Sequence, residues 1–445
     1  MNIKDQHIVV IGLGKTGYSV VSFFADRGES VVAMDTREQA PFAQAVNNSY
    51  PNVRVILGGL DEQVLCNAKK IILSPGLALA TKEIQAAITQ GVPVIGDIQV
   101  FADYAKAPVV AITGSNAKST VTTLLGDMAK DAGLNVAIGG NLGTPALELV
   151  NDNVQLYVME LSSFQLETTP NLNADVATVL NVSPDHLDRY NSYDDYWHAK
   201  HNIFNGCKAI VVNRDDKRSA PLKELNVKTI TFGMGESINH DFGIVKQNGE
   251  SYLAIDHQAL ICTKQLKIKG THNRSNALAA MALGSAAGLS LDSMLTTLQD
   301  YPGLEHRCQW VGKHNGVEFF NDSKGTNVGA TVAALEGLQS DVEGSIVLMA
   351  GGDGKGADFS YMKQAIQSGV KTLIAYGRDK ALIESALSDV TRVVLAENFE
   401  DAFEKACNSA STGDAVLLSP ACASFDMFQS FEHRGNTFVQ LVETL

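Results

Sequence analysis

The most informative segment for the fold of this chain is Pro108-Val109-Val110-Ala111-Ile112-Thr113-Gly114-Ser115-Asn116-Ala117-Lys118-Ser119-Thr120. An apolar, β-branched run passes directly into small polar residues and a lysine, which is typical of a buried strand followed by a phosphate-binding loop. A helix is predicted to begin at the end of this stretch and to stop at Gly133. Its apolar positions recur at helical spacing: Val121, Leu124, Leu125, Met128, Ala129 and Ala132.

Similar apolar runs alternate with helix-like stretches along the rest of the chain, which indicates parallel α/β sheets. The predicted strands span residues 7–11, 30–34, 70–73, 108–113, 155–159, 175–180, 209–212, 345–349, 371–376 and 415–418. Boundaries near 96–108 and at Tyr301-Pro302-Gly303 divide the chain into three domains, 1–97, 98–303 and 304–445. Short alternating segments in 234–269 predict an antiparallel addition to the middle domain.

The composition is that of a globular protein that does not bind polyanions. Of the 445 residues, 45% are hydrophobic and 19% are charged, and the net charge of −14 comes without a basic block, so no nucleic-acid partner is expected. No apolar run reaches the length of a membrane span and no secretory signal is recognised, so we expect a cytoplasmic protein. The six cysteines lack the spacing of a zinc site or a disulfide framework, which predicts reduced, mostly buried thiols.

A glycine-rich loop follows the first predicted strand. Gly12-Leu13-Gly14-Lys15-Thr16-Gly17 has the form G-x-G-x-x-G, and Asp35 ends the next strand at the offset of a dinucleotide fingerprint. The glycines supply a tight turn that brings backbone N–H groups and a helix N-terminus to a diphosphate. A dinucleotide, another diphosphate ligand and a plain strand–helix turn all remain open on this pattern.

The loop at Gly114 predicts a nucleotide triphosphate site. Lys118 is expected to hold the β- and γ-phosphates, and Ser119 to bind Mg²⁺. The spacing from Gly114 to Lys118 is shorter than in the usual phosphate-binding loop, and Ala117 stands at its second glycine. An ordinary strand–helix turn is the alternative.

Carboxylates and a histidine follow the next two strands of the middle domain. Glu160 ends one strand, at the sheet edge where α/β folds bind ligands. Its position is consistent with two roles, a ligand of Mg²⁺ or a solvated residue at the end of a strand. Asp185-His186-Leu187-Asp188-Arg189 follows the next strand, with surface polar residues as the alternative.

Taken together, these segments closely resemble the ATP-dependent Mur ligases of peptidoglycan synthesis, over nearly the whole chain. The resemblance rests on residues 114–120, 160–166, 181–189, 272–277, 306–307 and 321–327. Asp35-Thr36-Arg37 and residues 418–426 resemble the branch that adds D-glutamate. The implied fold is α/β with three domains: Rossmann-like N- and C-terminal domains around a central P-loop-type ATPase domain.

The resemblance assigns the first glycine loop to the UDP part of a UDP-linked substrate rather than to a dinucleotide. The implied UDP-substrate contacts are Lys15, Thr16, Asp35, Thr36, Arg37, Gly76, Asn141 and His186. The implied ATP contacts are Gly114, Ser115, Asn116, Ala117, Lys118, Ser119, Thr120, Asn273, Asn276, Arg307, Asp322 and Lys324. The implied D-glutamate contacts are Thr326, Lys355, Ser424, Phe425 and Phe431; pattern alone makes Gly351–Lys355 a flexible turn.

Lys200 looks like a surface helix lysine by pattern alone. The resemblance implies that it is carbamylated, which makes it an oxygen ligand suited to Mg²⁺. Two ions are then implied, one on Ser119 and Glu160 and one on His186 and carbamylated Lys200, with Lys118 stabilising the transferring phosphoryl group. The implied catalytic residues are Lys118, Glu160, His186 and Lys200.

The implied reaction joins UDP-N-acetylmuramoyl-L-alanine to D-glutamate through an acyl phosphate made from ATP. The resemblance also implies that the third domain closes onto the middle one, with Pro302-Gly303 as the pivot. We expect a monomer without a membrane span.

The alternative functions are a nucleotide-dependent oxidoreductase built on the Gly12 loop and a non-catalytic nucleotide-binding relative disabled by Ala117. We expect residue 117 to take a positive φ, which strains alanine.

Overall fold

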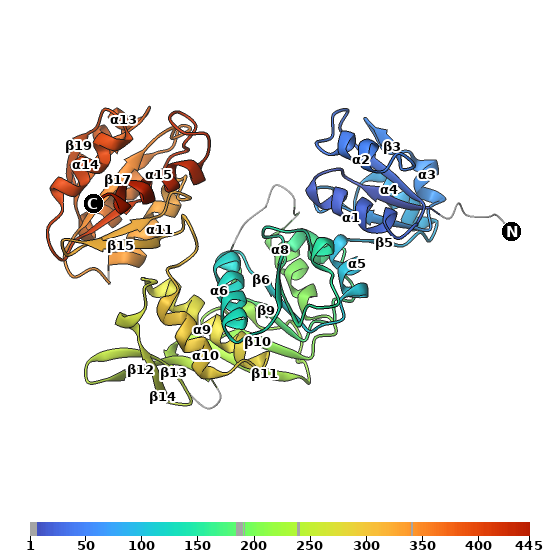
Figure 1. The fold of residues 1–445 in the computed structure, drawn as a ribbon, viewed down its shortest axis with the longest axis horizontal. Helices are drawn as coiled ribbons and strands as arrows, with labels where there is room; N and C mark the ends of the chain where they lie inside the picture. The colour runs from blue at the N-terminus through green and yellow to red at the C-terminus, as the bar shows by residue number, and fades with distance from the viewer. Residues whose placement is uncertain (1–6, 184–189, 191, 238–240, 340) are drawn as a thin grey trace. The chain divides into compact units, whose positions relative to one another are not determined.

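The computed structural model contains three β-sheets (Figure 1). It describes residues 7–183, 190, 192–237, 241–339 and 341–445. The residues cluster into two compact units. One consists of Met1–Gly243, Ile255–His257 and Leu278–Met294, and the other of Ile244–Ala254, Gln258–Ala277 and Leu295–Leu445.

The first sheet has five parallel strands in the order β3-β2-β1-β4-β5. The strands are β1 (Ile8–Ile11), β2 (Val31–Asp35), β3 (Arg54–Leu57), β4 (Lys70–Leu73) and β5 (Val94–Ile95), and the helices are α1 (Lys15–Ala25), α2 (Ala43–Ser49), α3 (Glu62–Cys66), α4 (Lys82–Thr89) and α5 (Asp97–Tyr104). Ile8 and Val10 enter one core and Val9 and Ile11 the other, because successive side chains of a strand point to opposite faces. The strand order reverses between β1 and β4, which is where open α/β sheets bind ligands.

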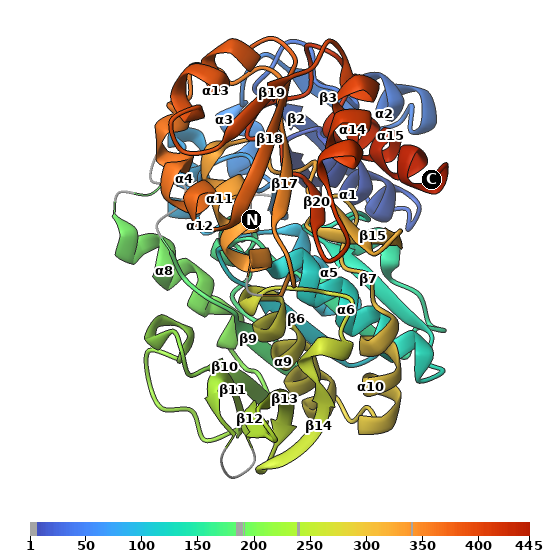
Figure 2. The same cartoon turned by 90° about the vertical axis from the view of Figure 1, so that its left-hand side faces the viewer.

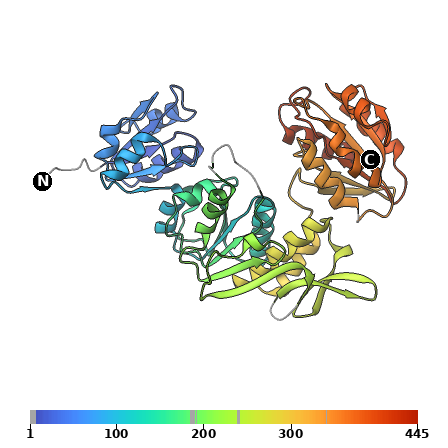
Figure 3. The same cartoon turned by 180° about the vertical axis from the view of Figure 1, so that it is seen from behind.

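The second sheet has the order β14-β13-β12-β11-β10-β9-β6-β8-β7. Its strands are β6 (Val109–Thr113), β7 (Val136–Gly140), β8 (Leu156–Glu160), β9 (Val176–Val179), β10 (Ala209–Asn213), β11 (Lys228–Glu236), β12 (Asp241–Gln247), β13 (Glu250–Ile255) and β14 (Gln258–Cys262). The pairs from β7 to β11 are parallel. The turn Asn248-Gly249 has φ angles of 53° and 83°, so β12 and β13 form a two-residue hairpin, which confirms the antiparallel addition (Figure 3).

The helices of this region are α6 (Lys118–Asp131), α7 (Ser163–Glu167), α8 (Tyr193–His201), α9 (Thr271–Ala286) and α10 (Leu291–Asp300). Helix α6 begins where the sequence predicts it. Val121, Leu124, Leu125, Met128 and Ala129 are fully buried, and Gly133 follows the helix with φ 84°. The predicted strand–loop–helix unit is therefore confirmed, except that Ala132 is exposed beyond the last turn.

The third sheet has the order β15-β16-β20-β17-β18-β19, with β15 and β16 antiparallel and the other pairs parallel. Its strands are β15 (Gln309–His314), β16 (Val317–Asn321), β17 (Ile346–Gly351), β18 (Val370–Tyr376), β19 (Arg392–Leu395) and β20 (Ala415–Leu418), and its helices are α11 (Val328–Gln339), α12 (Lys363–Gly369), α13 (Lys380–Leu387), α14 (Phe399–Ser409) and α15 (Phe431–Glu443). Helices α11 to α13 pack on one face and α14 and α15 on the other (Figure 2).

All ten predicted strands are present, with small differences at their ends. All six cysteines are free thiols; Cys207, Cys308 and Cys422 are buried and the other three are partly buried. Among the described residues, no helix combines the length and the apolar composition that a bilayer span requires.

Candidate functional site

The carboxyl ends of four neighbouring parallel strands form one edge of the second sheet. Ile112 of β6 pairs with Glu160 of β8, Gly140 of β7 pairs with the same Glu160, and Thr113 pairs with Val179 of β9. The loop from Gly114 to Ala117 therefore starts beside the Glu160 carboxylate. The strand register brings together two groups that the sequence singled out separately.

The loop is tied to the segment that follows β9. The backbone N–H of Asn116 donates to Asn181 Oδ1 over 2.8 Å, and the N–H of Ser115 donates to the Asn181 carbonyl over 2.9 Å. The Ser115 hydroxyl lies 2.9 Å from the Tyr196 hydroxyl of α8. These bonds hold the loop in one shape, so little ordering is left for a bound phosphate to impose.

Ala117 has φ 67° and ψ −6° and directly precedes α6. The expected positive φ is confirmed. An alanine in this left-handed region costs about 1 kcal/mol or more, because its Cβ approaches the neighbouring carbonyl oxygen.

We expect Ala117→Gly to raise kcat/KM for ATP roughly tenfold, or ~1.4 kcal/mol, by removing this strain and the methyl group beside the phosphate. Ala132→Gly at the other end of the same helix, where φ is −72°, is the matched control and brings no gain. The measurement is ATP kcat/KM at saturating co-substrates. Equal values within about twofold for Ala117→Gly and the parent would mean that the loop tolerates alanine.

Two lysines converge on the carbonyl oxygen of Gly114. Lys118 Nζ donates to it over 2.8 Å and to the Ser115 carbonyl over 2.9 Å, and Lys200 Nζ donates to it over 3.0 Å. Lys200 is only 2% exposed and its ammonium lies 4.5 Å from the centre of the Tyr196 ring. The interpretation of Lys200 as a surface helix residue is therefore wrong, and two cations lie at a loop predicted to bind phosphate.

Glu160 is 2% exposed, so its interpretation as a solvated strand-end residue is also wrong. Its Oε1 accepts a 2.7 Å hydrogen bond from Asn141 Nδ2, whereas Oε2 is buried without a hydrogen-bond partner among the described residues. A buried carboxylate oxygen that lacks a donor fits a cation ligand.

Of the other predicted metal ligands, Ser119 and His186, only one lies in the described part of the chain. Ser119, in the first turn of α6, belongs to the described part of the chain, whereas His186 lies in 184–189, outside the described residues. Within the described residues, no group of three or more His, Cys, Asp and Glu side chains could hold a metal ion.

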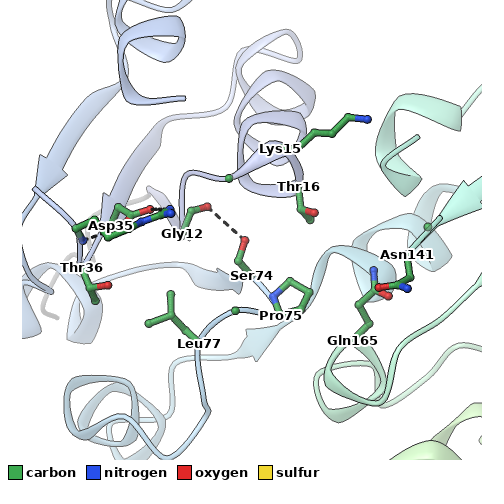
Figure 4. Close-up of a pocket in the computed structure, with 14 residues that line it drawn as sticks. Gly12, Lys15, Thr16, Asp35, Thr36, Ser74, Pro75, Leu77, Asn141 and Gln165 are labelled. Atoms are coloured by element: carbon green, nitrogen blue, oxygen red, sulfur yellow. Dashed lines mark hydrogen bonds and ion pairs between the residues drawn. The ribbon is translucent and has the colours of Figure 1, made fainter. Parts of the chain in front are cut away.

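A separate cavity of about 550 Å³ lies at the strand-order reversal of the first sheet (Figure 4). Figure 4 shows side chains from both the first and the second sheet regions of the same compact unit around it. Every described residue predicted to contact the UDP substrate lines it: Lys15, Thr16, Asp35, Thr36, Arg37, Gly76 and Asn141. The structure thus brings these seven residues together.

Two of the three glycines in the first loop, Gly12 and Gly17, leave no room for a side chain. Gly12 has φ 93°, and a Cβ on it would lie 2.7 Å from Ser74 Cβ. A Cβ on Gly17 would lie only 1.7 Å from the Gly12 carbonyl oxygen. A side chain at Gly17 would therefore push α1 away from the end of β1, whereas one at Gly12 would displace Ser74 at the end of β4.

Asp35 anchors the loop and Arg37. Its carboxylate accepts hydrogen bonds from the N–H of Leu13 over 2.7 Å, from the N–H of Arg37 over 2.9 Å, and from Arg37 Nε and NH2 over 2.8 and 2.7 Å. The bonds to Arg37 lower the pKa of Asp35 from 3.8 to about 2. These four bonds fix the position of the Arg37 side chain and of the Gly12 loop at the wall of the cavity.

The lowered pKa of Asp35 predicts a pH-dependent stability. Its contribution is present above about pH 4 and is lost as the pH falls towards 2, because the unfolded chain binds the proton more tightly. At pH 7 we expect Asp35→Asn to lose about 2 kcal/mol, reduced by solvent screening at the half-exposed Arg37. Hydrogen exchange of the β1 and β2 amides should become roughly thirtyfold faster at pH 7, with a smaller difference at pH 3. A difference that does not depend on pH would contradict this account.

Sequence reasoning gave Gln165 no role, yet it lines the same cavity. Its Oε1 accepts from the N–H and the hydroxyl of Ser162, and its Nε2 donates to Asp97 Oδ2 over 3.4 Å. Burial raises the pKa of Asp97 to about 6. The spacing Ser162 to Gln165 is that of a helix capping box, which could have identified the turn but not the cavity.

The predicted D-glutamate residues lie on segments that follow three adjacent strands, β16, β20 and β17. The N–H of Ala421 donates to the Gly325 carbonyl over 2.9 Å, and Asp353 and Ala423 pair as an isolated bridge. Lys324 Nζ lies 4.5 Å from the centre of the Phe431 ring. These contacts bring together the segments that carry Thr326, Lys355, Ser424, Phe425 and Phe431.

The predicted ATP residues of this region are mostly held by protein partners. Asp322 is 9% exposed, accepts from Ser419 Oγ over 2.7 Å and from the N–H of Cys308 over 3.1 Å, and has its pKa raised to about 7 by burial. Asn276 Nδ2 donates to Asn273 Oδ1 over 3.2 Å, and both residues lie inside α9, which begins earlier than expected. Arg307 and Lys324 are less buried.

Three family models match the chain in order. They are the Mur ligase MurD-like N-terminal domain over residues 6–96, the Mur ligase middle domain over 112–284, and the Mur ligase glutamate ligase domain over 306–422. The boundaries predicted from sequence lie between these matches, although the domain limits themselves stay a prediction.

Curated relatives cover the chain from end to end. It is 54% identical over 443 residues to UDP-N-acetylmuramoylalanine–D-glutamate ligase of Pseudomonas savastanoi pv. phaseolicola, covering 100% of this chain and 99% of the relative. It is 50% identical to the enzyme of that name from Pseudomonas aeruginosa, at 99% coverage of both chains, and 49% identical to that of Acinetobacter baylyi, at 98% of both.

Solved structures share the fold at low sequence identity. A UDP-N-acetylmuramoyl-L-alanyl-D-glutamate–2,6-diaminopimelate ligase superposes with a TM-score of 0.63 at 17% identity, covering 94% of this chain and 93% of the other. The UDP-N-acetylmuramate–alanine ligase of Thermotoga maritima gives 0.58 at 18% identity, covering 98% and 99%. With three matched domains, full-length relatives and this fold, the chain belongs to the Mur ligase family.

Proposed function

We propose that the chain is an ATP-dependent amide ligase that adds D-glutamate to UDP-N-acetylmuramoyl-L-alanine in peptidoglycan precursor synthesis. The observation that carries the proposal is the 49–54% identity, over essentially the whole chain, to relatives that bear this activity in their name. The cavity beside the Gly12 loop supports the proposal, because a UDP-linked substrate needs a diphosphate-binding site and this loop brings a helix N-terminus to the cavity.

The reaction proceeds through an acyl phosphate. A carboxylate oxygen of the substrate's alanine attacks the γ-phosphorus of ATP and ADP leaves; the amine of D-glutamate then attacks the acyl carbon and phosphate leaves. Both steps bring anions together, so catalysis consists mainly of charge neutralisation and alignment. Lys118 stabilises the negative charge of the transferring phosphoryl group. Its 2.8 Å hydrogen bond to the Gly114 carbonyl keeps the ammonium at the loop.

Mg²⁺ is the implied metal, and it neutralises triphosphate oxygens when bound. Ser119 and Glu160 are its protein ligands in this proposal, supported by the unpartnered buried Oε2 of Glu160. Carbamylated Lys200 and His186 hold a second ion. Carbamylation begins with loss of one proton from the Lys200 ammonium; the neutral amine then forms a bond between Nζ and the carbon of CO₂ and loses a second proton. The second cation beside Gly114 thereby becomes an anion.

The remaining contacts follow the resemblance residue by residue. Asn273, Asn276, Arg307, Asp322 and Lys324 serve ATP, and Lys355 and Thr326 serve the two carboxylates of D-glutamate together with Ser424, Phe425 and Phe431. A cation and hydroxyls are what a dicarboxylate requires. We propose that one copy of the chain holds all of these sites, as a monomer.

The proposal is tested by incorporation of labelled D-glutamate into the UDP-linked product, with ATP omitted or L-glutamate substituted as controls. We expect incorporation that requires ATP and D-glutamate. Oxidation of NADH or NADPH by a chosen substrate would favour the oxidoreductase instead. Binding of ATP and the UDP substrate without incorporation would favour a non-catalytic relative disabled by Ala117.

A further inference from the structure

Arg434, on the second turn of α15, is the largest fully buried side chain among the described residues, with 0% exposure. A buried charge is costly unless a carboxylate neutralises it or hydrogen bonds satisfy it. Within the described part of the chain Arg434 forms no ion pair. Its guanidinium is satisfied by neutral acceptors instead.

Those acceptors belong to two loops. Arg434 Nε donates to Ser323 Oγ over 3.0 Å, and NH2 donates to the Ser323 carbonyl over 2.9 Å. NH1 and NH2 both donate to the Cys422 carbonyl over 3.2 Å. The planar guanidinium fork thus joins the loop 321–326 after β16 to the loop 419–425 after β20, a geometry that a lysine cannot reproduce.

The two loops and α15 carry four of the five proposed D-glutamate contacts. Thr326 lies in the first loop, Ser424 and Phe425 lie in the second, and Phe431 begins the helix that carries Arg434. The Ser323 hydroxyl, which accepts from Arg434, donates in turn to the Phe431 carbonyl over 2.8 Å. One side chain therefore links all three segments.

Several charged groups lie around these loops. Asp322, the acidic neighbour in the first loop, has its pKa raised to about 7 by burial, so its negative charge is only partly present at neutral pH. Asp426, beyond the second loop, uses Oδ2 to accept from the N–H of Arg378. Burial raises the pKa of the Cys422 thiol in the second loop, and the charges of Asp353, Asp379 and Asp426 raise it further. What Arg434 supplies to the loops is therefore the geometry of its hydrogen bonds rather than a net positive potential.

We propose that Arg434 is a positioning residue for D-glutamate: it holds the loops 321–326 and 419–425 and the start of α15 in the one arrangement that binds the dicarboxylate. The inference rests on the proposed function. Arg434 is too deeply buried to touch the amino acid itself, so it acts through Ser323 and the Cys422 backbone.

The test measures KM separately for D-glutamate and for the UDP substrate. Arg434→Lys keeps the charge but loses the fork, and we expect it to raise KM for D-glutamate roughly tenfold while KM for the UDP substrate stays within about twofold. Arg434→Met removes both charge and fork and raises KM for D-glutamate further. If Arg434→Met fails to fold, Arg434→Lys and Ser323→Ala test the proposal instead. Ser323→Ala removes one hydrogen-bond acceptor of Arg434, and we expect it to raise KM for D-glutamate roughly threefold to fivefold.

Val442→Ala is the matched control, because Val442 is 1% exposed in the core on the same helix but lies away from the loops. We expect it to lower the melting temperature without changing KM for D-glutamate. KM does not depend on the concentration of folded enzyme, so a general loss of stability cannot imitate the effect. Unchanged KM for D-glutamate in the Arg434 variants, or an equal rise for both substrates, overturns the proposal. A parent enzyme without D-glutamate-dependent product formation overturns the proposed function itself, before any variant is made.

Discussion

Lys200→Ala should lower kcat by roughly a thousandfold or more while leaving the affinity for the UDP substrate within about twofold. Lys200 is buried and its Nζ lies 3.0 Å from the Gly114 carbonyl, at the loop proposed to bind ATP. It does not line the cavity proposed for the UDP group. In the proposed mechanism the substitution removes a carbamate that binds metal at the reacting phosphate, and it leaves the UDP pocket intact.

Added formate or acetate is expected to restore part of the rate, because a small carboxylate can occupy the space left by the carbamate. Lys208→Ala is the matched control: Lys208 forms a solvent-exposed ion pair with Asp175, and its loss should leave kcat unchanged. Equilibrium dialysis with the UDP substrate measures the affinity. A near-normal rate for Lys200→Ala without added carboxylate would reject the catalytic role.

Glu160→Gln should raise the Mg²⁺ concentration needed for half-maximal rate at least tenfold and lower kcat by roughly a hundredfold. The glutamine keeps the size of the side chain and an oxygen that can accept from Asn141, but it removes the negative charge from the buried, unpartnered Oε2. The measurement is the initial rate against Mg²⁺ concentration at saturating substrates.

Glu148→Gln, at an exposed position of the same domain, is the control and should show the parent's Mg²⁺ dependence. His186→Ala is expected to raise the Mg²⁺ requirement as well. Unchanged metal dependence in both the Glu160 and the His186 variants would remove these residues from the site.

The core strands and the phosphate-binding loop could be predicted from the sequence because their signals are local. β6 is buried along its whole length and α6 buries one face, so an apolar run and a helical period reveal both. The position of Glu160 follows from the same logic, since it is the last residue of a buried strand. Its burial could not be predicted, because it depends on Asn141 from another strand end.

Edge strands and side chains that meet across loops were harder to predict. β3 and β19 lie at sheet edges, and each is a four-residue strand whose first and last residues are exposed. Helix α8 reads as a surface helix because its sequence is mostly polar, yet Lys200 and Tyr196 are buried against the Gly114 loop. Gln165 and Arg434 act through partners far away in the chain, which no spacing rule connects.

Phosphate release from ATP distinguishes a D-glutamate-adding ligase from the alternatives when it is measured with UDP-N-acetylmuramoyl-L-alanine present or absent and with D-glutamate present or absent. We expect sustained release only when both are present, with one phosphate for each amide bond formed. Sustained release that is independent of both the UDP substrate and the amino acid would contradict the assignment of this chain as a D-glutamate-adding ligase.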